Sequence, residues 1–163
     1  MNLDLIFSAA QEAFLSYKNL SGNKKADFLE KIADILEENR SAIVLIAVKE
    51  SNLPEGRING ELGRTTGQIK LFANQLREGS WVEATIDPAD PKRSPLPKAD
   101  IRRMLIPIGP VVVFGASNFP LAFSTAGGDT ISALAAGCPV IYKGHPAHPD
   151  TSKFVGDCIS QAV

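Results

Sequence analysis

Two short apolar runs, separated by a segment of small residues, constrain the fold of this chain most. The runs are residues 111–114 and 139–142, and each is followed by polar residues. The first run shows no polar alternation, which is typical of a strand covered on both faces in a parallel sheet. Residues 124–136 between the runs read as a helix, and a helix is the usual crossover between parallel strands. The sequence therefore predicts an α/β fold, in which ligands bind at the carboxyl ends of the strands.

Length and charge limit the functions that this chain can have. Its 163 residues suit one ordinary domain, and 44% hydrophobic with 21% charged residues is the composition of a globular protein. A formal net charge of −1 gives no electrostatic reason to bind nucleic acid or an anionic membrane. We therefore expect neither as a partner.

The cysteines and the amino terminus predict a cytoplasmic protein. Cys138 and Cys158 are too few for a disulfide framework, which favours a reducing compartment. Neither has a nearby base in the sequence, so we expect both thiols to be packed inside the fold. The amino terminus lacks a basic region, and no apolar run approaches the roughly 18 residues of a membrane span.

Four helices are predicted ahead of the crossover unit, from apolar residues at helical spacing. They cover residues 3–17, 22 to about 39, 43–48 and 58–77. The third could also be a buried strand, but Ser41 offers a cap and Pro54 a stop, so we favour a helix. Gly60, Gly63 and Gly67 in the fourth indicate close backbone packing.

Two strands and a proline-rich loop follow these helices. We predict strands at residues 81–86 and 101–106, and four prolines between positions 88 and 97 exclude a helix or a central strand there. The loop should be exposed and extended. A turn at 107–110 leads into the crossover unit, and residues 151–162 have the spacing of a last helix.

The residues after the first strand of the crossover unit are candidates for a binding site. Gly115, Ala116 and Ser117 have small side chains that let another group approach the backbone, although a tight turn that needs glycine explains Gly115 equally well. Asn118 has three interpretations. Its amide can cap the next helix, hold the turn, or donate a hydrogen bond into a cleft as an oxyanion ligand.

The helix and the second strand leave further alternatives open. The pair Gly127 and Gly128 implies that either the sheet or a flat ligand comes close. Lys143 at the strand end can contact a phosphate or a ribose hydroxyl, or it can be an ordinary surface lysine. His145 and His148 lack a third ligand nearby, so we interpret them as loop histidines and expect no metal.

Several blocks of residues in the right order resemble the first part of an aldehyde dehydrogenase. They are IPIGPV at 106–111, FGASNFP at 114–120, AGGD at 126–129, ALAAGCP at 133–139 and KGHPAHP at 143–149. GASNFPLAF, AGGDT and KGHPAHP, with ELGRTTGQIKLFA at 61–73, are similar to one branch of that family. This branch contains the 2-oxoglutarate semialdehyde (2,5-dioxopentanoate) dehydrogenases and NADP-linked fatty aldehyde dehydrogenases. The resemblance spans essentially the whole chain.

The resemblance implies a division of the chain and roles for its residues. Residues 1–80 would be the helical part of the cofactor-binding domain, 81–106 the bridging and oligomerisation strands, and 107–163 the first strand, helix, strand and helix of a Rossmann-like parallel sheet. Asn118 would stabilise the oxyanion. The small residues at 115–117 would border the cofactor, and Lys143 would face its adenosine ribose.

The resemblance also implies a preference for NADP, with NAD as the alternative. Many NAD-preferring members carry a glutamate three residues after the lysine, and this chain has Pro146 there. Without that carboxylate a 2′-phosphate is not repelled, and Lys143 and His145 lie nearby in sequence.

Proteins of this family are much longer than this chain, and the implied nucleophilic cysteine and general-base glutamate match no residue in it. We therefore expect an incomplete domain with an exposed sheet edge, inactive by itself, from an enzyme that oxidises a small aldehyde and forms a homo-oligomer, a dimer or tetramer when complete. Two alternatives remain. One is a non-catalytic nucleotide-binding or assembly module, and the other is a structural fragment that pairs its open edge with another copy.

Overall fold

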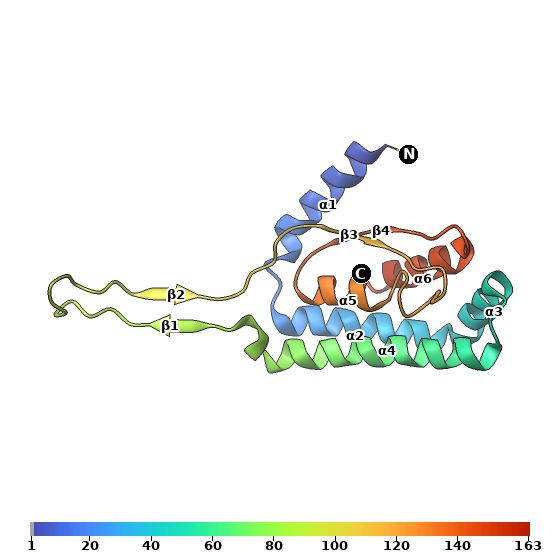
Figure 1. The fold of residues 1–163 in the computed structure, drawn as a ribbon, viewed down its shortest axis with the longest axis horizontal. Coiled ribbons are helices and arrows are strands. Elements are labelled where there is room, and N and C mark those ends of the chain that lie inside the picture. Colours follow the sequence, from blue (N-terminus) through green and yellow to red (C-terminus); the bar gives the residue numbers. More distant parts are fainter. Residues whose placement is uncertain (1) are drawn as a thin grey trace.

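The computed structural model describes residues 2–163 and shows a helical body from which a long hairpin extends (Figure 1). The first two helices begin at side-chain caps. In α1 (Leu3–Tyr17) the Asn2 Oδ1 atom accepts hydrogen bonds from the amides of Asp4 and Leu5, and in α2 (Gly22–Glu38) the Ser21 Oγ atom accepts one from Lys24. Both predicted helices are confirmed. Each begins where a side-chain oxygen can accept from the first amides, directly ahead of an amphipathic stripe.

The six-residue apolar run forms a helix, as predicted, within α3 (Arg40–Ser51). The expected cap at Ser41 is wrong, because the helix begins one residue earlier and no side chain caps it. Only one side of the run is buried, so Ile43 is 1% exposed while Leu45 is 71% exposed. Asn52, with a left-handed φ of 54°, ends the helix ahead of Pro54.

The longest helix, α4 (Glu55–Glu78), lies along α2 and forms the core with it (Figure 1). The expected close packing of its glycines is wrong. A Cβ atom on Gly60 or Gly67 would meet nothing within 4 Å, and one on Gly63 would only reach the Arg40 side chain at 3.9 Å. These glycines lie on the exposed face of the helix. Gly79, with a φ of 83°, ends it, close to the predicted end at residue 77.

Both strands of the hairpin are shorter than the sequence predicts. Residues 81–86 were expected to be one strand, but Ser80–Val82 forms a 3-10 turn (η1) and the strand β1 covers only Thr85–Asp87. The amide of Glu83 donates to Ser80 O at 2.9 Å, and Glu83 has a left-handed φ of 50°, so the chain turns there. β2 likewise covers only Ile101–Arg103 and pairs antiparallel with β1. The proline-rich loop between them is exposed, as expected.

The predicted crossover unit is present. β3 (Val111–Phe114) and β4 (Val140–Lys143) are parallel, and α5 (Gly128–Ala135) connects them. The predicted helix at 124–136 is too long at its start, because residues 124–127 form turns. The last helix, α6 (Pro149–Gln161), packs against α3 and α2.

One face of the small sheet is open. Val113 is buried, but Val112 is 46% and Phe114 is 70% exposed, so the expectation that both faces of β3 are covered is wrong for this chain. The exposed strand agrees with the predicted incomplete sheet. In residues 2–163 no helix has the combined length and apolar character that crossing a membrane requires.

Candidate functional site

The carboxyl ends of β3 and β4 lie side by side and bring together several residues singled out in the sequence. Phe114 pairs with Lys143, and the amide of Gly115 donates to Lys143 O at 3.1 Å. A Cβ atom on Gly115 would lie 3.4 Å from the amide nitrogen of His145. Gly115, Lys143 and His145 thus lie together at the edge of the sheet formed by the carboxyl ends of β3 and β4.

Gly115 is required by a neighbouring side chain. A Cβ atom there would lie 2.0 Å from the Tyr142 hydroxyl oxygen, which is itself within 2.7 Å of Ser124 Oγ. The φ of Gly115 is not in the left-handed region. Of the two sequence interpretations, a turn that needs glycine for its backbone angles is therefore excluded, and the room next to this backbone is taken by Tyr142.

His148 fixes the backbone that leaves β3. It is fully buried, its Nε2 atom is 2.7 Å from Ala116 O, and its Nδ1 atom is 3.2 Å from Ser152 Oγ. Because a carbonyl only accepts, Nε2 carries the proton and Nδ1 accepts from the serine hydroxyl. His148 does lie in a loop, as predicted, but it is a buried structural histidine. A histidine four residues before a serine, at the start of a helix, is a sequence signal for the contact with Ser152 alone.

His145 presents a free ring N–H at the same edge. Its Nδ1 atom accepts from the amide of Ala147 at 3.1 Å, so the proton of the neutral ring is on Nε2. The ring stacks on His148 with centroids 5.7 Å apart and planes at 29°. This stacking holds the ring in place at the ends of the two strands.

Lys143 and Asn118 have side chains without partners in residues 2–163. Lys143 is exposed and forms no ion pair or side-chain hydrogen bond there. The carboxamide of Asn118 is exposed and makes no hydrogen bond to the described residues, although its backbone oxygen accepts from Arg57 Nη2 at 2.8 Å. The helix α5 is preceded by Gly127 without a side-chain cap, so Asn118 is not its cap. Ser117 beside it is also exposed.

One face of α4 holds the segment that carries Asn118. Arg57 and Arg64 face this segment, and their spacing of two turns places them on one side of the helix. The Arg57 guanidinium lies 5.2 Å from the ring centroid of Phe119, and that of Arg64 lies 5.1 Å from the ring of Phe123. The two rings meet edge to face at 5.2 Å. Each arginine therefore covers an aromatic ring of the loop.

Glu61, on the same face of α4, is the strongest anchor of this loop, and the sequence analysis did not identify it. Its Oε1 atom accepts from the amides of Leu121 and Ala122 at 2.8 and 2.9 Å, and the residue is only 6% exposed. Its Oε2 atom is buried without a partner among the described residues. Its partners are backbone amides 60 residues away, which no side-chain pattern reveals.

The glycine pair packs against protein. A Cβ atom on Gly127 would lie 2.5 Å from Ala122 O, and one on Gly128 would lie 3.1 Å from the amide end of Gln68. The close neighbours are thus the preceding loop and α4. Neither the sheet nor a flat ligand, the two sequence alternatives, is needed to explain the pair.

Glu50 supports the loop after β4 from the side of α3. Its carboxylate accepts from the amides of Asp150 and Thr151 and from the Thr151 hydroxyl, at 2.7 to 2.9 Å. Partial burial acts to raise the pKa of Glu50, but the hydrogen bonds from Thr151 and Asp150 outweigh it, and the pKa is lowered. The carboxylate is therefore held charged at the amino end of α6, where a negative charge is favoured.

Neither cysteine is placed for chemistry. Cys138 and Cys158 are both buried, as expected, and burial with the nearby Asp157 raises the pKa of the Cys158 thiol. Within residues 2–163 there is no group of three or more side chains that could hold a metal ion.

Comparison with known proteins places this arrangement in a family. Residues 1–163 match the profile of the aldehyde dehydrogenase family. Over 161 residues, 99% of this chain, it is 50% identical to the alpha-ketoglutaric semialdehyde dehydrogenase of Acinetobacter baylyi, and over 154 residues, 94% of this chain, it is 54% identical to alpha-ketoglutaric semialdehyde dehydrogenase 2 of Azospirillum brasilense. The chain spans only 31% and 29% of these relatives.

The fold agrees with a solved structure. The NAD-dependent benzaldehyde dehydrogenase of Corynebacterium glutamicum superposes with a TM-score of 0.80 at 25% identity, over 98% of this chain and 33% of that one. The match over every residue, together with the strand-end site, shows that this chain belongs to the aldehyde dehydrogenase family.

Proposed function

We propose that this chain is the amino-terminal, cofactor-side part of an NAD(P)-dependent dehydrogenase that oxidises 2-oxoglutarate semialdehyde to the dicarboxylic acid. The proposed substrate rests on the two relatives with that activity in their names, to which the chain is 50% and 54% identical. Within the described residues no cysteine is placed as a nucleophile, so the chain alone is expected to be inactive.

The observation that carries the proposal is the free carboxamide of Asn118. When a thiolate adds to an aldehyde carbon, negative charge develops on the aldehyde oxygen, and a fixed N–H donor stabilises it. An amide has no proton to lose at neutral pH, so it stays a donor throughout. Arg57 holds the carbonyl of Asn118 itself, His148 holds the backbone before it and Glu61 the backbone after it, which supports a donor of fixed position.

The strand-end edge fits a nicotinamide dinucleotide that carries a 2′-phosphate. Lys143 offers an unpaired ammonium and His145 a free Nε2–H, while position 146 is a proline and adds no carboxylate. These groups favour an anionic substituent on the adenosine ribose, which we propose makes NADP the preferred cofactor over NAD. The cofactor supplies the hydride acceptor. Gly115, Ala116 and Ser117 would border it.

The remaining expectations from the sequence stay proposals. Residues 1–80 and 107–163 would build the cofactor-binding domain, and residues 81–106 would form bridging strands between copies in a cytoplasmic homo-oligomer. The exposed apolar side chains of the hairpin, including Ile86 and Ile101 at 66% and 54%, support a contact there.

The proposed role of Asn118 is tested in the complete enzyme that contains this chain. Asn118→Ala should lower kcat for 2-oxoglutarate semialdehyde by about 10²–10³. The KM for the cofactor should change little, because the amide acts on the aldehyde oxygen. The control is Asn74→Ala, which removes an exposed amide on α4. An Asn118→Ala enzyme with unchanged kcat contradicts the role.

The cofactor preference is tested by isothermal titration of the same enzyme with NADP and NAD. We expect tighter binding of NADP, and Pro146→Glu should shift the preference toward NAD by placing a carboxylate next to the 2′-phosphate. Much tighter binding of NAD by the unaltered enzyme would disprove the preference and leave the role of Asn118 standing.

A further inference from the structure

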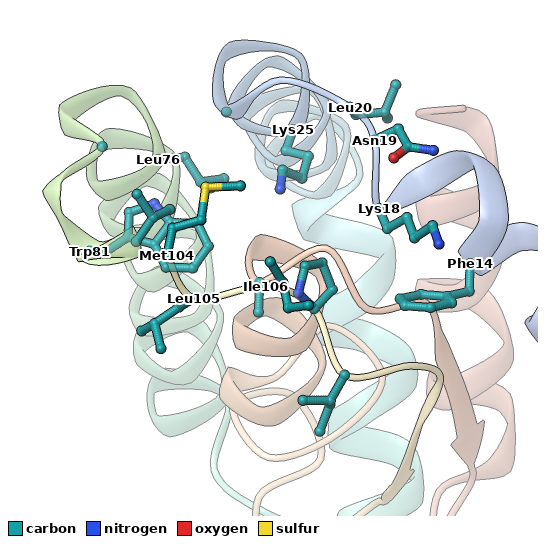
Figure 2. Close-up of a pocket in the computed structure, with 16 residues that line it drawn as sticks. Phe14, Lys18, Asn19, Leu20, Lys25, Leu76, Trp81, Met104, Leu105 and Ile106 are labelled. Carbon is teal, nitrogen blue, oxygen red and sulfur yellow. The ribbon is translucent and has the colours of Figure 1, made fainter. Parts of the chain in front are cut away.

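A cavity lies beside the amino end of β3, at the end of the small sheet opposite to the candidate site (Figure 2). Its volume is about 630 Å³, within the usual range for sites that bind small molecules. The walls come from α1, α2, the last turn of α4, η1 and the segment that leads from β2 to β3. Most of the lining side chains are apolar; they include Phe14, Leu76, Trp81, Met104 and Ile106.

Lys25 is the unusual residue of this cavity. It is only 6% exposed, and among residues 2–163 its ammonium has no hydrogen bond or ion pair. Figure 2 shows the side chain directed from α2 toward the space between Trp81, Met104 and Ile106. The nearest aromatic contact is the Trp81 ring, whose centroid is 5.9 Å from Nζ. The stem of Lys25 is packed into the wall, while Nζ stays accessible from the cavity, where a weak cation–π contact leaves room for a stronger, anionic partner.

The electrostatics of the cavity favour an anion. Among residues 2–163 no Asp or Glu lines it, and the second cation, Lys18, is exposed at the rim, 5.2 Å from the Phe14 ring. Burial lowers the pKa of Lys25, and the nearby Cys138 opposes that shift. The end of α4 comes close to the start of α2, since a Cβ on Gly22 would lie 2.7 Å from Leu76 O. The negative end of one helix and the positive end of the other thus largely offset each other.

We propose that this cavity binds an organic monocarboxylate with an apolar body. The carboxylate would contact Lys25, and the body would pack against Trp81, Met104 and Ile106. With the body packed on Trp81 and Met104, a second carboxylate would lie against this apolar wall and away from Lys18 at the rim, so a dicarboxylate is disfavoured. This inference is independent of the proposed function, because the cavity is at the amino end of β3 and the candidate active site is at its carboxyl end.

The test is a titration of the chain with octanoate, followed by tryptophan fluorescence. Trp81 is the only tryptophan and lies in the cavity wall, so its emission reports on binding there. We expect a saturable change with octanoate and at least about tenfold weaker binding of octanol, which has the same tail without the charge. A small dicarboxylate, glutarate, should also bind more weakly than octanoate.

Two variants distinguish a specific contribution of Lys25 to octanoate binding from the effect of removing any positive charge nearby. Lys25→Met keeps the length of the apolar stem and removes the ammonium, and Lys24→Met removes an exposed ammonium next to it in the sequence. Octanoate affinity should fall about tenfold or more in the first variant and stay unchanged in the second. The first variant should fold, because methionine keeps the packed apolar stem and removes an ammonium that has no hydrogen bond or ion pair among residues 2–163.

Three results would overturn the proposal: no saturable response to octanoate, equal affinity for octanoate and octanol, or equal affinity of the parent chain and Lys25→Met for octanoate. If Lys25→Met fails to fold, the comparison of octanoate with octanol on the unaltered chain decides the matter by itself.

Discussion

At the scale of single residues, identical amino acids have opposite roles according to what surrounds them. Gly115 lies against the Tyr142 hydroxyl, where a Cβ would be 2.0 Å from oxygen, while Gly60 lies in a helix with nothing within 4 Å of the same position. The first glycine is needed for packing. The second only lowers the helix propensity of α4.

Alanine substitutions distinguish these two glycines. Gly115→Ala should lower the free energy of unfolding by about 1–3 kcal/mol, because Tyr142 must move. Gly60→Ala should raise it by about 0.5–1 kcal/mol. Urea unfolding measures both. Adding Tyr142→Phe to Gly115→Ala should recover part of the loss, and a neutral Gly115→Ala would contradict the packing argument.

The hydrogen bonds accepted by Glu61 lead to a second prediction for single residues. Glu61→Ala leaves the buried amides of Leu121 and Ala122 without an acceptor and should lower the free energy of unfolding by about 3 kcal/mol. Glu61→Gln keeps an acceptor oxygen and should cost about 1 kcal/mol. Urea unfolding gives the two values, and hydrogen exchange should show faster exchange at those two amides in the alanine variant. Equal costs for the two variants would mean that the accepted hydrogen bonds do not matter.

At the scale of helices and strands, the sequence predicts the elements that have a periodic apolar pattern. It does not predict element boundaries that depend on contacts with other parts of the chain. The stripes of α1, α2, α4 and α6, and the parallel pair β3 and β4, follow from patterns spread over many residues. The strand predicted at 81–86 is wrong because Glu83 takes a left-handed conformation that its residue type does not indicate. The helix predicted from Ser124 begins later, because Gly127 packs on the backbone of the preceding loop.

The residues of the candidate site also fall into those that the sequence predicts and those that it does not. The resemblance to the family picks out residues 115–118 and 143–145, since they occur in contiguous blocks. The ties made by Glu61, Arg57 and His148 could not be predicted, because each joins a side chain to backbone far away along the chain.

The link between α3 and α6 should depend on pH through Glu50. Its folded-state pKa is lowered, so the stability that it contributes is present above the ordinary carboxyl range and is lost as the pH falls through the folded value. The difference in unfolding free energy between the parent chain and Glu50→Gln should therefore shrink from about pH 6 to about pH 3. Glu12→Gln, an exposed carboxylate on α1, is the control. A constant difference across this range would contradict the assignment.

At the scale of the whole molecule, exposed apolar side chains lie on the hairpin, on the open face of the small sheet, on α1 and on residues 104–108. Ile86, Leu96 and Ile101 on the hairpin are each more than half exposed, as is Phe114 on the sheet. A water-exposed surface of this kind favours association.

We expect the chain to self-associate through the hairpin. Size-exclusion chromatography with light scattering should give a molar mass above that of a monomer and rising with concentration. Ile86→Glu with Ile101→Glu should reduce that mass, and Phe114→Glu should leave the hairpin contact intact. A monomer at every concentration would contradict the expectation.

Under the proposed role of Asn118, the face of α4 that covers Phe119 and Phe123 would influence reactivity through the loop that it holds, without itself contacting the substrate. A library of random variants selected for a new aldehyde would collect changes at Arg57, Glu61 and Arg64 alongside changes in the loop itself. Engineering by substitution on this helix would then tilt the Asn118 amide in small steps without altering any group that touches the substrate.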